Sequence, residues 1–214
     1  VVITVGGSEA ISFAFSAVAD AGEEIIVPEP FYTNYNGFAA LADVKLVPLT
    51  LDVKDGFRLP SLEAFAAKIT PRTRAVLLNS PSNPTGAVYS KEELKRVVDL
   101  VKKHDLYLIS DEVYKEFVYD GASHTSVFDF PEIDDRTIVV DSISKRFSCC
   151  GARIGAVITR NPEVYDAVLK FAQARLCPPT VEQIGALGAY RMGPDYFAPV
   201  REEYQKRRDV LYQG

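Results

Sequence analysis

The chain of 214 residues is 47% hydrophobic and 25% charged, a composition typical of one large folded domain with a sizeable core, or of one domain plus part of another. Its net charge of −5, without a long basic run, argues against nucleic acid as the main partner. No apolar run approaches the roughly 20 residues that a membrane-spanning helix needs, so we expect no membrane partner.

The cysteines and histidines indicate neither a disulfide framework nor a metal site. Cys149 and Cys150 adjoin each other and Cys177 makes the number odd, a poor pattern for disulfides that favours a reducing cytoplasm. His104 and His124 lie far apart, without the spacing of metal ligands. We therefore interpret both histidines as surface residues and expect no bound metal.

The first predicted strand, residues 1–5, is followed by a glycine turn and a helix that ends near Ala19. Ser8 is placed to cap this helix, and Gly6 and Gly7 let a ligand approach the exposed backbone N–H groups. The turn is therefore a favourable phosphate site, although many strand-to-helix turns carry glycines.

Apolar runs that alternate with helical patterns continue along the rest of the chain. Further strands are predicted at residues 25–27, 45–51, 74–78, 106–110, 137–140 and 156–159. Helices are predicted at residues 31–41, 60–69, 91–103, 162–174, 180–191 and 196–212, and residues 122–135 are predicted as a loop. This alternation indicates an α/β layered fold with a mostly parallel sheet.

Chemically useful side chains follow several of the predicted strands. They are Gly7 with Ser8, Asn83, Asp111, and Ser144 with Lys145. Ligands of open α/β sheets bind beyond the carboxyl ends of the strands, so we expect these residues to converge on one rim.

Lys145 is the residue around which this rim is organised. A lysine delivered into a pocket by a buried strand can be desolvated, which makes its amine nucleophilic, whereas an isolated lysine after a strand is usually a surface residue. Arg153, between small residues, is well placed to bind an anion, and Asn83 before Pro84 is a candidate for a cis peptide bond.

Two tyrosines open the helix predicted at residues 31–41. Tyr32 and Tyr35 are three residues apart and so are expected to share a helix face. They are either core aromatics or rings that stack on a flat ligand.

Taken together, these motifs resemble the class I/II pyridoxal-phosphate aminotransferases, of the aspartate aminotransferase-like superfamily of fold type I. The motifs that carry the resemblance are Gly6-Gly7-Ser8-Glu9-Ala10, Pro30-Phe31-Tyr32, Asn83-Pro84-Thr85-Gly86, Asp111-Glu112-Val113-Tyr114, Ser142-Ile143-Ser144-Lys145 and Arg153-Ile154-Gly155. The resemblance implies a three-layer sandwich in which a mostly parallel, mixed sheet is flanked by helices.

The resemblance also implies roles for the residues around the ring of pyridoxal 5′-phosphate. Lys145 would form the Schiff base with the aldehyde and later move a proton, and Asp111 would keep the pyridine nitrogen protonated. Asn83 and Tyr114 would bind the phenolic oxygen, and Tyr32 would stack on the ring. Asp111 and Tyr114 thus join Lys145 as expected catalytic residues.

The phosphate of the cofactor would be held at the other end of the same pocket. The resemblance assigns this role to Gly7, Ser8, Ser142, Ser144 and Arg153, which combine a helix N-terminus, hydroxyls and a guanidinium.

Some positions depart from the family pattern and concern substrate choice. Ser8 stands where several relatives that bind dicarboxylates have a basic residue. Arg175 lies near the position from which other relatives supply an arginine to the neighbouring subunit, but it is equally compatible with a surface helix arginine. The arginine that binds the substrate carboxylate lies, in the family, beyond Gly214, so Asn79 is the one substrate contact that we expect within the chain.

Cys149 and Cys150 lie between Lys145 and Arg153. They are interpreted either as small residues that pack the loop or as a redox pair, and a disulfide between adjacent cysteines would be strained.

The expected function is transfer of an amino group between an amino acid, with aspartate favoured, and a 2-oxo acid such as 2-oxoglutarate. The alternatives are a lyase or decarboxylase that uses the same cofactor, and a cofactor-binding fragment without turnover. The chain is expected to be a fragment: residues 1–195 form a cofactor-binding large domain and residues 196–214 begin the helix toward a C-terminal small domain. Family members usually form homodimers with active sites at the interface.

Overall fold

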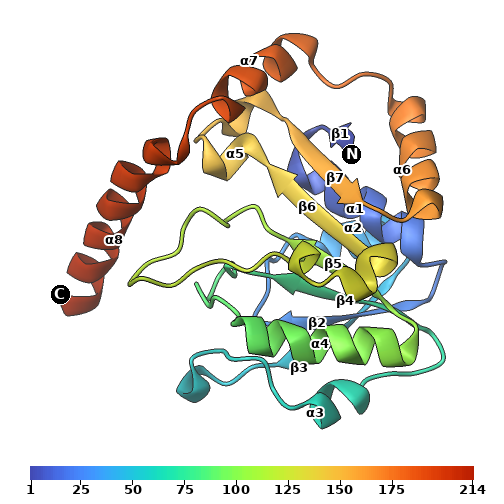
Figure 1. Cartoon of the computed structure of the whole chain (residues 1–214). Coiled ribbons are helices and arrows are strands. Elements are labelled where there is room, and N and C mark those ends of the chain that lie inside the picture. The colour runs from blue at the N-terminus through green and yellow to red at the C-terminus, as the bar shows by residue number, and fades with distance from the viewer.

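The computed structural model describes residues 1–214 and shows a single sheet with helices on both faces (Figure 1). The two last helices, α7 and α8, pass along one end of the sheet and away from it, and the chain ends at the tip of α8 (Figure 1).

Seven strands form the sheet in the order β1-β7-β6-β5-β4-β2-β3. Their bounds are β1 Val2–Thr4, β2 Glu24–Glu29, β3 Lys45–Thr50, β4 Thr73–Asn79, β5 Tyr107–Asp111, β6 Thr137–Ser142 and β7 Gly155–Thr159. Strands β6, β5, β4, β2 and β3 pair in parallel, whereas β7 is antiparallel to both β6 and β1. The expectation of a mostly parallel, mixed sheet is confirmed.

Eight α-helices and five short 3-10 helices complete the fold. The α-helices are α1 Gly6–Val18, α2 Tyr35–Leu41, α3 Leu62–Ala66, α4 Lys91–His104, α5 Ile143–Arg146, α6 Pro162–Arg175, α7 Thr180–Tyr190 and α8 Phe197–Gln213, and the 3-10 helices are η1 Val53–Asp55, η2 Val127–Asp129, η3 Pro131–Arg136, η4 Cys150–Ala152 and η5 Pro194–Tyr196. One hydrophobic core joins the sheet to α1, α2 and α6, and a second joins its other face to α3 and α4. Two cores on opposite faces of one sheet make the three-layer sandwich that was expected.

Helix α4 shows how closely local sequence specifies some of these elements. The Ser90 hydroxyl accepts from the Glu93 N–H, and the Glu93 carboxylate accepts from the Ser90 N–H, which closes a capping box at the N-terminus. Leu94, Val97 and Val101 share one face and are buried in the second core. The predicted helix at residues 91–103 is therefore confirmed.

Three predicted helix starts are wrong, each for a local reason. Helix α2 begins at Tyr35, because the preceding residues form turns in which the Tyr35 N–H bonds to the Tyr32 carbonyl, so Tyr32 and Tyr35 do not share a helix face. Helix α3 begins at Leu62 and not at Pro60, because the Ser61 side chain caps it by accepting from the Ala64 N–H. Helix α1 begins at Gly6, which places Ser8 inside its first turn and not at its cap.

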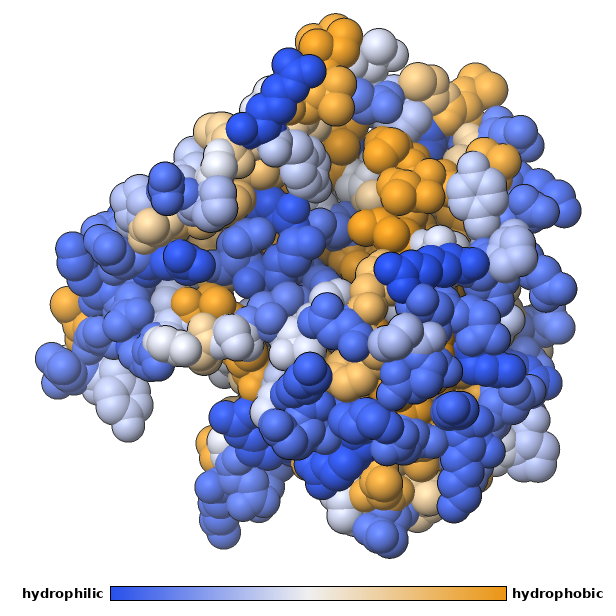
Figure 2. All heavy atoms as spheres, viewed as in Figure 1, coloured by the Kyte–Doolittle hydropathy of each residue, from blue (hydrophilic) through white to orange (hydrophobic).

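The C-terminal helices are the most exposed part of the molecule. Helix α8 buries none of its residues, and Val181, Ile184 and Leu187 of α7 are also exposed. Figure 2 shows apolar side chains gathered over α7 and the segment that joins it to α6, at the top of the view. No helix combines the length and the apolar character needed to cross a membrane.

Gly155 permits the closest approach of β7 to the start of α1. A Cβ atom at Gly155 would lie 2.5 Å from the carbonyl carbon of Gly6 and 2.8 Å from the Gly7 nitrogen, both of which are backbone atoms. We predict that Gly155→Ala displaces the glycine turn and lowers the free energy of unfolding by about 1–3 kcal/mol. Urea denaturation measures the loss, and Gly185→Ala, where a Cβ meets open space on α7, is the matched control. Equal stabilities of the two variants would contradict the prediction.

Candidate functional site

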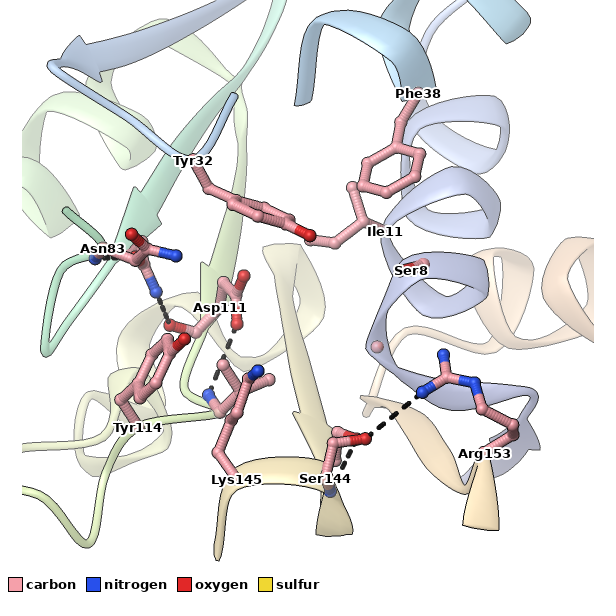
Figure 3. Close-up of a pocket in the computed structure, with 14 residues that line it drawn as sticks. Ser8, Ile11, Tyr32, Phe38, Asn83, Asp111, Tyr114, Ser144, Lys145 and Arg153 are labelled. Carbon is pink, nitrogen blue, oxygen red and sulfur yellow. Dashed lines mark hydrogen bonds between the residues drawn. The ribbon is translucent and has the colours of Figure 1, made fainter. Parts of the chain in front are cut away.

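A pocket of about 180 Å³ opens at the carboxyl edge of the central strands (Figure 3). It brings together all eleven site residues expected from the sequence and adds three apolar ones. The lining residues are Gly7, Ser8, Ile11, Tyr32, Phe38, Asn79, Asn83, Asp111, Val113, Tyr114, Ser142, Ser144, Lys145 and Arg153.

The register of the sheet explains why residues from distant parts of the chain meet here. Asn79 at the end of β4 is the pairing partner of Asp111 at the end of β5. Ser142 ends β6, the next strand, and pairs with Gly155 at the start of β7. Because neighbouring strands lie about 5 Å apart, these strand ends form one continuous edge.

Lys145 is the third residue of α5, the single helical turn that follows β6. Figure 3 shows its side chain pointing into the pocket toward Asp111. The Lys145 Nζ atom lies 6.0 Å from the centre of the Tyr114 ring. The structure thus places Lys145 in the lining of the pocket, but its side chain is exposed to solvent and not desolvated as the sequence suggested.

Asp111 carries the most unusual electrostatics of the pocket. Its carboxylate is buried at the end of the central strand and forms no ion pair; it accepts hydrogen bonds from the Tyr35 hydroxyl at 2.6 Å and from the Val113 N–H at 3.3 Å. Burial raises the pKa of Asp111 to about 6 despite these two hydrogen bonds, which favour the charged form. A ligand that brings a positive charge to Asp111 would relieve this cost.

The opposite end of the pocket is built to receive an anion. The first turn of the 13-residue helix α1 contributes Gly7 and Ser8. The Ser142 and Ser144 hydroxyl oxygens lie 3.0 Å apart, and Arg153 Nη1 is 3.5 Å from the Ser144 oxygen (Figure 3). A helix N-terminus, two hydroxyls and a guanidinium favour a phosphate or a comparable anion.

Asn79 is held differently from what the sequence suggested. Its Nδ2 donates to the Asp111 carbonyl at 2.9 Å, and its Oδ1 accepts from the Asn83 N–H at 2.6 Å. Both polar ends are thus engaged by the backbone, which favours a role in positioning Asn83 over the direct substrate contact that was expected. The bond between Asn83 and Pro84 is cis, as anticipated.

Tyr35 is a component of the site that the sequence did not reveal as such. Its side chain is buried, and its hydroxyl is the closest partner of the Asp111 carboxylate. Tyr32 extends into the pocket from the loop before α2 (Figure 3), with its ring edge-on to Tyr35 at 5.5 Å between centroids. The apolar side chains of Ile11 and Phe38 also line the pocket, and no motif marked them.

Two further residues have surroundings that the sequence did not specify. His124 is not a surface residue: its side chain is 11% exposed and its Nε2 lies 3.1 Å from the buried Glu112 carboxylate. Arg175 Nε donates to the Glu9 carboxylate at 2.9 Å, so its guanidinium is paired within its own chain.

The adjacent cysteines also differ from the simplest expectation. Both thiols are free; Cys149 is half-buried, whereas Cys150 is exposed. Cys150 is therefore not a buried packing residue.

Comparison with known proteins agrees with this arrangement over the whole chain. The sequence profile of the family "Aminotransferase class I and II" matches residues 1–214. The putative aminotransferase YugH of Bacillus subtilis is 36% identical over 214 residues, and an aspartate aminotransferase of Rhizobium meliloti is 32% identical over 216 residues; both matches cover the whole chain, but 55% and 52% of those proteins.

Solved structures give the same result. A structure titled Pyrococcus protein-A1 superposes with a TM-score of 0.93 at 34% identity, and a Thermus thermophilus aspartate aminotransferase double mutant superposes with a TM-score of 0.91 at 35% identity; each match covers 99% of this chain and 55% of the other. The chain thus spans about half the length of the relatives it matches. It belongs to the class I and II aminotransferase family.

Proposed function

We propose that the chain is the cofactor-binding part of an enzyme that uses pyridoxal 5′-phosphate to move an amino group from an amino acid to a 2-oxo acid. Family membership supports aminotransferase chemistry. The observation that carries the proposal is one pocket in which the Lys145 amine faces a buried, unpaired Asp111 carboxylate, with an anion site beyond it.

The residues present fit this cofactor at both of its ends. The acid without a cationic partner suits a protonated ring nitrogen, and the N-terminus of α1 with Arg153 suits the phosphate. When bound, pyridoxal phosphate supplies an aldehyde that condenses with amines and a ring that withdraws electrons from the substrate carbon.

The residues then have distinct roles in the proposal. Lys145 would hold the aldehyde covalently and, when free of it, would carry a proton at Nζ. Asp111, braced by Tyr35, keeps the ring nitrogen protonated. Asn83 and Tyr114 bind the phenolic oxygen.

The remaining contacts hold the cofactor in place. Tyr32 covers the ring face. Gly7, Ser8, Ser142, Ser144 and Arg153 hold the phosphate.

We favour aspartate and 2-oxoglutarate as substrates. Support comes from relatives named aspartate aminotransferase, which include the Rhizobium meliloti and Pyrococcus abyssi proteins. The proposal places the group that binds the substrate carboxylate outside this chain, because the relatives are nearly twice as long.

The same reasoning supports three proposals about organisation. Residues 1–195 form the cofactor domain, and α8 leads into a second domain, since α8 buries none of its residues. A homodimer would cover the exposed apolar residues of α7, such as Val181 and Ile184. The three free cysteines favour a cytoplasmic location.

The first prediction concerns the attachment site of the cofactor. On addition of pyridoxal phosphate, the chain is expected to develop a protein-bound absorption band, and borohydride reduction should fix the cofactor on Lys145, as found by peptide mass spectrometry. Lys145→Ala should abolish both signals, whereas Lys170→Ala, which removes an exposed lysine of α6, should leave them unchanged. Cofactor fixed at another lysine would refute the assignment.

A second prediction follows from the buried acid. Folded Asp111 binds its proton near pH 6 and the unfolded residue near 3.8, so stability is lost as pH rises between these values, and the full cost is present above them. This difference corresponds to about 3 kcal/mol. Without cofactor, Asp111→Asn should therefore be more stable than the natural protein at pH 8 by up to this amount, and equally stable near pH 3.

Chemical denaturation at several pH values measures this gain. Asp166→Asn, at an exposed position of α6, is the control and should show no such pH-dependent gain. With cofactor present, Asp111→Asn should weaken binding, because the ring nitrogen loses its anionic partner. A stability gain that is the same at pH 3 and pH 8 would argue against a desolvated charge.

The third prediction concerns turnover. The isolated chain is expected to bind cofactor but to show very low activity with aspartate and 2-oxoglutarate, because domain closure around the substrate needs more than this chain. The longer protein should form glutamate and oxaloacetate in equal amounts. Stoichiometric release of ammonia would instead indicate a lyase, and robust turnover by the 214 residues alone would disprove the expectation.

A further inference from the structure

A cluster of four charged residues, two buried and two half-buried, adjoins Lys145 outside the pocket. Arg146, the residue after Lys145, places Nη2 2.7 Å from Asp141 Oδ2. Lys115 Nζ lies 3.2 Å from the same oxygen, and Glu116 Oε1 lies 3.5 Å from Arg146 Nε. None of these four residues lines the pocket, and none has a role in the proposed reaction.

The Asp141–Arg146 pair forms the centre of this cluster. The two residues are only 4% and 7% exposed. The Arg146 guanidinium also lies 5.4 Å from the centre of the Tyr190 ring, which ends α7. The pair thus ties α5 to β6, to α7 and to the segment after β5 that carries Lys115 and Glu116.

Helix α5 needs such an anchor. It has four residues, too few for a stable helix without tertiary contacts. Lys145 and Arg146 are consecutive on this turn, so their side chains diverge by about 100°. Fixing Arg146 on the buried side therefore holds Lys145 toward the pocket.

Burial makes this anchor sensitive to the loss of either partner. Removing one member of a buried ion pair leaves an uncompensated charge, whereas removing both members is often tolerated. Other titratable groups act on the same cluster: Glu112 raises the pKa of Asp141, and His124 with Arg201 of α8 lowers that of Glu116, although burial dominates and raises both.

We propose that Asp141 and Arg146 are positioning residues for Lys145: their buried ion pair orients the lysine-bearing turn and sets the electrostatic balance at the lysine amine. The inference rests on the proposed function, because the orientation of Lys145 matters only if its amine bonds to the cofactor.

The test compares Asp141→Asn, Arg146→Met, the double variant and Arg146→Lys in the 214-residue chain with added pyridoxal phosphate. Three quantities are measured: the rate at which the protein-bound cofactor band appears, the pH midpoint of that band, and thermal unfolding without cofactor. Arg207→Met on α8 removes an arginine from an exposed ion pair with Glu203 and is the matched control.

The two single variants are expected to slow cofactor attachment by about tenfold and to shift the pH midpoint by about one unit in opposite directions. Arg146→Met leaves one carboxylate of the cluster in excess, which favours the protonated lysine–cofactor linkage and raises the midpoint. Asp141→Asn leaves one cation of the cluster in excess and lowers the midpoint. The double variant should have a midpoint close to that of the natural chain. Arg146→Lys, which keeps the positive charge, should shift the midpoint only slightly, and the Arg207→Met control should not shift it.

If the pair is purely structural, the variants should unfold at lower temperatures but share the pH midpoint of the natural chain. That result would overturn the proposal. If Arg146→Met does not fold, Asp141→Asn and Arg146→Lys decide: a lowered midpoint for the first with a near-natural one for the second supports positioning, and equal midpoints contradict it. Absence of the band in the natural chain would instead refute the proposed function. The two failures are therefore distinguishable.

Discussion

A carboxylate buried at the end of the central strand, with no cation beside it, is the constraint on which the site depends. The Asp111 carboxylate accepts hydrogen bonds from the Tyr35 hydroxyl and from one backbone N–H, but burial still raises its pKa to about 6. Parallel strands on either side bring Asn79 and the Lys145 turn to the same edge. The pocket is therefore organised around a charge whose partner has to arrive with the ligand.

The reversed strand β7 completes the opposite end of the pocket. Because β7 is antiparallel to β6, its amino end, and not its carboxyl end, meets the rim, and Arg153 lies two residues before its first residue. The absence of a side chain at Gly155 lets the glycine turn before α1 approach closely. The anion site thus depends on one change of strand direction and on two glycines, because a Cβ atom at Gly6 would overlap the Arg153 guanidinium.

The sequence predicted the sheet, the rim and the membership of the pocket because each depends on local signals. Apolar, β-branched runs followed by polar residues mark strand ends, and parallel strands align those ends. Contacts between residues far apart in the chain could not be predicted. The Tyr35 hydroxyl donates a hydrogen bond to the Asp111 carboxylate across 76 residues, and no spacing in the sequence indicates this. The engaged carboxamide of Asn79 and the pairing of Arg175 with Glu9 likewise depend on where the backbone passes. The start of α2 was missed because turn hydrogen bonds replace the helix before Tyr35.

The position of β1 at the edge of the sheet bears on the order in which the molecule is assembled during translation. Val2–Thr4 pairs with β7 alone, through residues that begin at Gly155. Strand β1 therefore leaves the ribosome some 150 residues before its partner, and the loop that must close is among the longest in the fold. The strands β2 to β5 pair only with one another or with β6, so the edge that carries Asp111 needs shorter loop closures than the anion end of the pocket.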